Sequence, residues 1–243
     1  FGAAGKGHVA EALLPATTLM LFIKFGIDTA SAIGPRRDPV IREGFLGALF
    51  LYFIVCSTLV LLLSSGACAD AWDTVLPNVP MSFIAPALWL IPFQVCHDAL
   101  MNAVLGMSTF VRFNLVKLFQ PMAFSLSLVA LLLGGWLPLD GSAGLVRVIW
   151  LYPISYAFAG LLMILLSGSA LPFVMRGSLG ICLSLLRMGG PIHLAFLLLY
   201  LNRRIDTWVI QRFLDPEDNG IYAVVVAYLE VAWFVSRPMS SLV

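Results

Sequence analysis

The chain has 243 residues, of which 60% are hydrophobic and 11% are charged, and its formal net charge is +1. Soluble domains carry about 25% charged residues, so this composition excludes an ordinary water-soluble fold. A net charge so close to zero also excludes a large electrostatic interface with nucleic acid. The four cysteines have neither the spacing of a disulfide framework nor that of a metal site.

The predicted elements are membrane-spanning helices, each of which needs about 20 mostly apolar residues. Seven segments meet this criterion: about 9–33, 45–63, 83–107, 115–133, 145–166 and 192–209, and a seventh that begins near residue 221. Barrel strands are excluded because none of these runs alternates polar and apolar residues. The predicted fold class is therefore all-α, a polytopic membrane helix bundle.

The connections between the spans differ in charge, and this difference predicts the orientation. The connections after the first, third and fifth spans hold the basic residues, namely Arg36, Arg37, Arg42, Arg112, Lys117, Arg176 and Arg187. The alternate connections 64–80 and 134–144 contain neither Lys nor Arg. Because basic loops stay in the cytoplasm, the first span runs from outside to inside. We expect an internal fragment of a longer membrane protein, with at least one helix upstream.

Charged side chains inside the predicted spans are the candidate functional residues. A charge at the centre of a membrane helix costs about 2.5–3.5 kcal/mol on insertion scales and usually faces protein or a water-filled cavity. Six such residues lie in the first, sixth and seventh spans: Lys24, Asp28, Arg203, Arg204, Asp206 and Glu230. These three cations and three anions can either neutralise one another or leave cations for an anionic substrate.

Helical spacing pairs some of these charges and not others. Lys24 and Asp28 stand at i, i+4, and Arg203 and Asp206 stand at i, i+3, so each pair shares one face of its helix. Arg204 points about 100° away from Arg203. Asp206 therefore cannot easily pair with both arginines, which leaves substrate contact open as an alternative to mutual neutralisation.

Three further polar residues lie in other spans. His97 and Asp98, inside the third span, could form half of a hydrolytic site, but the sequence offers no matching nucleophile or metal spacing. We therefore interpret this pair as part of a helix–helix hydrogen bond. Arg147, near the outer end of the fifth span, either extends to the membrane interface or faces an outer cavity.

Three stretches resemble the bacterial polysaccharide-transporter flippases. "FGAAGKGHVAEALLP" is similar to the outer loop and second helix of that family, and "GMSTFVRFNLVKLFQP" to its fourth-to-fifth connection. "LNRRIDTWVIQRFLDPEDNGIYAVVVAYLEVAW" resembles its seventh and eighth helices, whose Asp, Gly-x-Tyr and Glu correspond to Asp206, Gly220, Tyr222 and Glu230. His8 stands near the place of a family tyrosine, so we assign it no role.

The family, which includes O-antigen-type oligosaccharide flippases, belongs to the multidrug/oligosaccharidyl-lipid/polysaccharide exporter superfamily. The resemblance implies a V-shaped fold of two lobes with six or more helices each. Residues 1–170 would be a first lobe that lacks its first helix and has five spans. Residues 171–190 would be a cytoplasmic linker, either an interfacial helix or a partly ordered loop. Residues 191–243 would hold the first two spans of the second lobe.

The resemblance also implies a function. The protein would flip undecaprenyl-diphosphate-linked oligosaccharide from the inner to the outer leaflet of the bacterial cytoplasmic membrane, by alternating access, for export of O-antigen, capsule or exopolysaccharide. The implied partners are this lipid-linked glycan, membrane lipid, and the glycan polymerase and chain-length proteins of the same pathway, with no nucleic acid. We expect no enzymatic activity, no catalytic residue, no cofactor and no metal.

Site residues follow from combining the resemblance with the charges. We expect Arg203, Arg204, Lys24 and Arg147 to bind the diphosphate in a cavity, because guanidinium groups pair bidentately with phosphate. We expect the carboxylates of Asp206, Glu230 and Asp28 to pair with cations or to couple ions. The alternatives are a lipid-linked peptidoglycan precursor flippase, a drug/cation antiporter of the same superfamily and, in a different class, a membrane glycan polymerase or acyltransferase.

Overall fold

The computed structural model describes residues 2–76, 79–107, 110–136, 142–167 and 170–213, followed by 215, 217–218 and 220–229. Within these ranges the side chains of residues 2–4, 110–116, 200, 203, 204, 207 and 211 are not described. The regular secondary structure of the described residues is helical, without a β-strand. The all-α prediction is confirmed.

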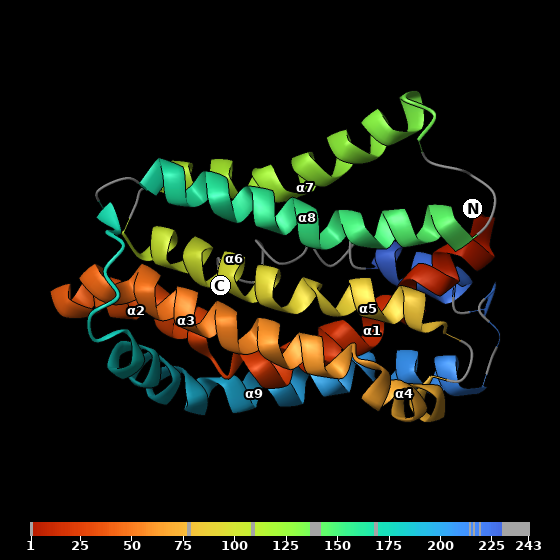
Figure 1. Ribbon diagram of the computed structural model, residues 1–243, viewed down its shortest axis with the longest axis horizontal. Helices are drawn as coiled ribbons and strands as arrows, with labels where there is room; N and C mark the ends of the chain where they lie inside the picture. Colours follow the sequence, from red (N-terminus) through yellow and green to blue (C-terminus); the bar gives the residue numbers. More distant parts are fainter. Residues whose placement is uncertain are drawn as a thin grey trace.

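Long helices lie side by side along the longest axis of the molecule (Figure 1). In the described part of the chain they are α1 (Gly2–Lys24), α2 (Ile27–Arg37), α3 (Pro39–Leu63), the 3₁₀ turn η1 (Gly66–Cys68), α4 (Ala69–Val75), α5 (Met81–Leu88), α6 (Leu90–Met107), α7 (Phe110–Leu133), α8 (Ser142–Ser167) and α9 (Ser178–Phe213). A further apolar helix covers Gly220–Leu229.

Among the described residues, five helical stretches are long and apolar enough to cross a membrane. They are Gly5–Arg37, Pro39–Leu63, Met81–Met107, Ser142–Ser167 and Ser178–Leu199. The first four of these match the first, second, third and fifth predicted spans, whereas Ser178–Leu199 overlaps the sixth predicted span, 192–209, only at residues 192–199. The fourth and seventh predicted spans contain the shorter apolar helices Lys117–Leu133 and Gly220–Leu229. The chain is therefore a multi-pass membrane protein.

The first span is broken, which the sequence analysis did not predict. α1 ends at Lys24 and α2 begins at Ile27, while the two residues between them, Phe25 and Gly26, have positive φ angles of 39° and 79°. Glycine adopts such angles without a steric penalty. A single glycine in an apolar run is also compatible with an unbroken helix, so the local sequence does not reveal the break.

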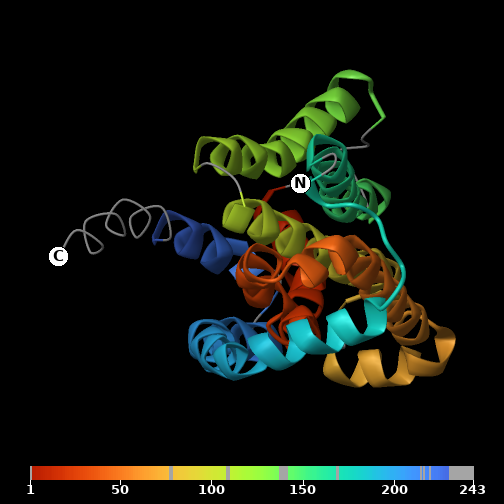
Figure 2. The same ribbon diagram turned by 90° about the vertical axis from the view of Figure 1, so that its left-hand side faces the viewer.

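α9 is longer than predicted at its beginning. It starts at Ser178, continues through Pro191 and ends at Phe213, so much of the predicted linker 171–190 belongs to the same helix as the sixth span. Pro191 removes one backbone hydrogen-bond donor and favours a bend. Figure 2 shows the beginning of α9 at an angle to its remainder. The division into two lobes and a linker stays a prediction.

The core surrounds α6, which packs against α2, α3 and α8. Ile91, Val95 and Ala99 occupy one face of α6 at four-residue spacing and are fully buried. On the same helix, Gly106 lies so close to the backbone of Ala32 that a Cβ atom there would collide with it. Small residues allow membrane helices to approach this closely, and they hold α2 against α6.

The basic connections meet at one end of the molecule. A cavity of about 770 Å³ there is lined by Arg36 at the end of α2, Arg42 in α3, Met107 at the end of α6, and Pro172 before α9. α4 and the end of α9 lie together at the opposite end (Figure 1). The basic connections thus lie on one side of the bundle, as their alternation in sequence predicts, while the assignment of that side to the cytoplasm stays a prediction.

Candidate functional site

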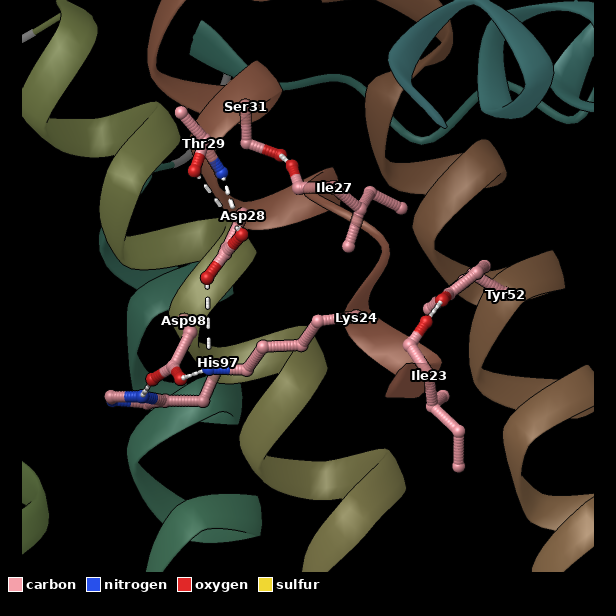
Figure 3. A network of polar contacts seen from close by, with 9 residues as sticks. All are labelled: Ile23, Lys24, Ile27, Asp28, Thr29, Ser31, Tyr52, His97 and Asp98. Atoms are coloured by element: carbon pink, nitrogen blue, oxygen red, sulfur yellow. Dashed lines mark hydrogen bonds and ion pairs between the residues drawn. The ribbon is translucent and has the colours of Figure 1, made fainter. Parts of the chain in front are cut away.

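A network of charged side chains lies at the break between α1 and α2 (Figure 3). Nζ of Lys24, the last residue of α1, lies 2.6 Å from Oδ2 of Asp98 in α6 and 3.6 Å from Oδ2 of Asp28 in α2. Nδ1 of His97 lies 3.3 Å from Oδ1 of Asp98. One cation therefore joins two carboxylates from two other helices.

The break between α1 and α2 creates two helix ends beside the network, the start of α2 near Asp28 and the end of α1 at Lys24. Asp28 stands in the first turn of α2, where the helix dipole favours a carboxylate. Its Oδ1 accepts a hydrogen bond of 2.8 Å from the backbone N–H of Thr29, while its Oδ2 faces Lys24. At the end of α1, the hydroxyl of Tyr52 in α3 donates to the carbonyl oxygen of Ile23, one of the carbonyls that a helix end leaves without an intrahelical partner.

The network is largely buried within the protein. The exposed fractions of the side chains are 12% for Lys24, 23% for Asp28, 18% for Asp98 and 4% for His97. Buried charges need partners, because removal of one leaves the other uncompensated. With neutral His97, one positive and two negative charges give a formal charge of −1. The network therefore offers no surplus positive charge to a phosphate group.

His97 also has neighbours other than Asp98. Its ring meets that of Tyr156 in α8 edge to face, with the ring centroids 5.1 Å apart. Its Nε2 is buried without a hydrogen-bond partner among the described residues. His97 also lines an otherwise mostly apolar cavity of about 420 Å³ between α3, α6 and α8. Asp98 thus orients a histidine at the boundary between the charged network and an apolar space.

Lys24 and Asp28 form an ion pair, as their spacing in the sequence predicts. Asp98 also pairs with Lys24, and His97 contacts Asp98. Helical spacing does not predict the contact between Lys24 and Asp98, and only the neighbouring His97 is an expected partner of Asp98 in the sequence. The signal that could have found it is a carboxylate inside the third span, where an unpaired charge is costly. The helix–helix contact expected of the His97–Asp98 pair is made by Asp98.

The other predicted site residues lie elsewhere. Arg147 is exposed on the first turns of α8, and its Nη1 donates to the carbonyl oxygen of Trp136 after α7. Asp206 is exposed on α9 and accepts a hydrogen bond from the hydroxyl of Tyr222 in the helix Gly220–Leu229. The side chains of Arg203 and Arg204, and the whole of Glu230, lie outside what the structure describes.

The described residues of this region do not provide a set of metal ligands. Within the ranges given above, no group of three or more His, Cys, Asp or Glu side chains is placed to hold a metal ion. The chemistry that the network does offer is ion pairing and proton exchange among Lys24, Asp28, His97 and Asp98. Such intramembrane networks commonly occur at substrate or ion pathways.

Comparison with known proteins identifies a family. The family model described as polysaccharide biosynthesis protein matches residues 1–243, the whole chain. Neither the curated proteins nor the solved structures gave a match. The match covers every helix that contributes to the charged network.

Proposed function

The chain belongs to the polysaccharide biosynthesis protein family and has a role in polysaccharide export, and on this premise we propose that it is a flippase for polyprenyl-diphosphate-linked glycans. It moves undecaprenyl-diphosphate-linked oligosaccharide from the inner to the outer leaflet of the bacterial cytoplasmic membrane. It does so by alternating access between two helical lobes, without making or breaking a covalent bond.

The observation that carries this proposal is the buried network at a broken span. Discontinuous membrane helices whose ends carry charged groups are typical of transporters, in which they form binding and coupling sites. A protein that only held its helices together could use apolar packing and avoid the cost of intramembrane charge. Here Lys24, Asp28 and Asp98 gather where α1 stops and α2 begins.

The diphosphate is assigned to the two arginines on α9. Lys24 already pairs with two carboxylates, so in this proposal it holds α1 and α6 together and contributes less to the substrate. Arg203 and Arg204 supply guanidinium groups that fit phosphate oxygens bidentately. Arg147, which bonds the carbonyl of Trp136, retains further donors and can contact the substrate near the outer end.

The carboxylates complete the proposed mechanism. Asp28 extends from α2, beyond the break at Gly26, so in this proposal a tilt of α2 about Gly26 lengthens its contact with Lys24. Asp206 and Glu230 pair with cations or couple ions while the lobes alternate. A coupling ion changes the balance between the two states only through different affinities for them.

A drug/cation antiporter is the second candidate function. The observation that favours it is the carboxylate excess of the network, two aspartates against one lysine. A cationic substrate needs such an excess, whereas a diphosphate needs the opposite. The arginines on α9 favour the glycan flippase, since a cation-binding cavity has less need of them.

The test uses the full-length protein in a bacterium that lacks its own flippase. Surface polysaccharide and membrane abundance are measured for the wild type, for the double variant Arg203→Gln with Arg204→Gln, and for Arg187→Gln as an exposed arginine control near the start of α9. We expect the wild type and Arg187→Gln to restore the polysaccharide and the double variant to fail at equal abundance.

Other outcomes separate the alternatives. Restoration by all three proteins keeps the flippase function and removes the arginines from the site. If the wild type fails, transport of the strain's own extracted lipid-linked glycan is measured in vesicles. Failure there, with export of a cationic dye, would replace the flippase with the antiporter.

A further inference from the structure

A third cavity, of about 440 Å³, lies where α1, α4 and the last turns of α9 come together. It is at the end of the molecule opposite the basic connections (Figure 1), which the loop charges place outside the cell. Its polar and aromatic lining comes from three helices: Glu11 in α1, Thr74 in α4, and Trp208, Arg212 and Phe213 in α9. The remaining lining residues are apolar, and the size is in the usual range for small-ligand sites.

Glu11 brings a carboxylate into a secluded position. Its residue is only 2% exposed, and its Oε2 lies 3.5 Å from Nδ1 of His8 one turn earlier in α1. Burial of a carboxylate is expensive unless it is hydrogen-bonded. A carboxylate has several acceptor positions, so Glu11 at the wall of the cavity can accept hydrogen bonds from a ligand in addition to its contacts within the protein.

Two further lining residues, Trp208 and Arg212, belong to α9 and provide an aromatic ring and a guanidinium group. They stand at i, i+4, so they share one face of the helix. The indole of Trp208 is half-buried and packs against the hydrophobic core. Arg212 is exposed and, among the described side chains, has neither an ion-pair nor a hydrogen-bond partner. A flat apolar ring thus lies one turn from a guanidinium with five donors.

We propose that this cavity binds a sugar ring of the lipid-linked oligosaccharide, a subsite that rests on the flippase function proposed above. A pyranose carries hydroxyl groups around its rim and apolar C–H groups on its faces. Glu11 accepts hydrogen bonds, Arg212 donates them, and Trp208 offers its face to the C–H groups. Charge-assisted bonds to the hydroxyls give direction to an otherwise neutral ligand.

Charge distinguishes the sugar from the other ligands that this membrane protein could meet. A diphosphate gains from Arg212 but is repelled by the carboxylate of Glu11. A cationic drug gains from Glu11 and from the face of Trp208, but is repelled by Arg212. A neutral, hydroxyl-rich ring uses both charged groups as hydrogen-bond partners and opposes neither, so the lining fits the glycan best.

The test measures binding to the purified full-length protein in detergent with three probes. They are lipid-linked oligosaccharide extracted from the bacterium that encodes the protein, undecaprenyl diphosphate without sugar, and the cation tetraphenylphosphonium. The pocket variants are Glu11→Gln, Trp208→Leu and the exposed Thr74→Val. Trp208→Phe, which keeps an aromatic face, and Trp150→Leu, a tryptophan of α8 outside this cavity, are the controls.

We expect Glu11→Gln and Trp208→Leu each to weaken binding of the lipid-linked oligosaccharide about tenfold, as for the loss of one charge-assisted or stacking contact. Thr74→Val should weaken it less, and both controls should keep it. Binding of undecaprenyl diphosphate should not change in any variant. A melting temperature equal to that of the wild type shows that each variant is folded, and Thr74→Val supplies a surface test if the buried variants do not fold.

Three results overturn the proposal. If the variants lose binding of both lipids equally, these residues have a structural role and do not recognise the sugar. If oligosaccharide binding is unchanged in all pocket variants, the sugar does not bind in this cavity. A selective loss of tetraphenylphosphonium binding identifies a cation site. If the wild type binds neither lipid, the proposed flippase function is wrong. If the wild type and all pocket variants bind the oligosaccharide equally, the flippase function is retained and only this subsite is wrong.

Discussion

Gly26 and Gly189 meet backbone to backbone, so that a Cβ atom on either residue would collide with the other. Gly26 is in the break between α1 and α2, and Gly189 lies in α9 just before Pro191. The contact therefore joins the discontinuity in the first span to the bend in the sixth. It also places α9 beside the charged network, because Lys24 and Asp28 flank the same break.

The first prediction concerns Gly26. Gly26→Ala should destabilise the full-length protein by at least about 1 kcal/mol, because alanine is strained at a φ of 79° and its Cβ meets the backbone of Gly189. Thermal unfolding in detergent checks this. Gly180→Ala is the matched control, since a Cβ there meets open space within a helix. Equal melting temperatures for Gly26→Ala and the wild type would contradict the close contact.

The second prediction concerns the ion pair between Lys24 and Asp98. Lys24→Met should cost about 3 kcal/mol, because two carboxylates stay buried without their cation, and Asp98→Asn should cost less, because Lys24 keeps Asp28. The double variant should cost less than the sum of the two, with a coupling energy of at least about 1 kcal/mol. Reversible unfolding in mixed micelles measures all four proteins. Simple additivity would show that the two side chains do not interact.

The third prediction ranks the two carboxylates. Asp28→Asn should destabilise the protein less than Asp98→Asn, since Lys24 is 3.6 Å from Asp28 and 2.6 Å from Asp98. Asparagine at position 28 also keeps an oxygen to accept from the backbone N–H of Thr29. The same micelle titration gives both values. The reverse order would mean that Asp28 is the main partner of Lys24.

The fourth prediction separates positioning from ion coupling at Asp206. Its carboxylate accepts a hydrogen bond from Tyr222, and Asn can accept the same bond. If Asp206 only positions the helix Gly220–Leu229, Asp206→Asn should keep polysaccharide export and Asp206→Leu should lose most of it. If Asp206 couples an ion, both variants should fail at normal abundance. Tyr222→Phe is the control that removes the bond and keeps the carboxylate.

Much of the fold could be predicted because the membrane imposes it. A span needs about 20 apolar residues, and this demand places the first, second, third and fifth spans without knowledge of their neighbours, whereas the sixth begins earlier than predicted. The pairing of Lys24 with Asp28 is also expected from their four-residue separation, although the two side chains extend from different helices on either side of the break at Gly26. These features depend on short stretches of sequence.

Other features depend on residues far apart in the chain. Lys24 meets Asp98 across 74 positions, and helical spacing cannot tell which helices face each other. The break at Gly26 is accompanied by the close approach of Gly189 from α9. Arg147 was expected at the interface or in a cavity, and its bond to the carbonyl of Trp136 depends on the path of the α7–α8 connection.

The charge imbalance of the network has an electrical consequence. With His97 neutral, Lys24 opposes Asp28 and Asp98, and the cluster has a formal charge of −1 in the membrane-spanning part of the chain. One elementary charge that crosses a membrane potential of 100 mV changes the free energy by about 2.3 kcal/mol. Any transition that carries the network along the membrane normal therefore makes the balance between its end states depend on voltage, in proportion to the distance that the cluster travels.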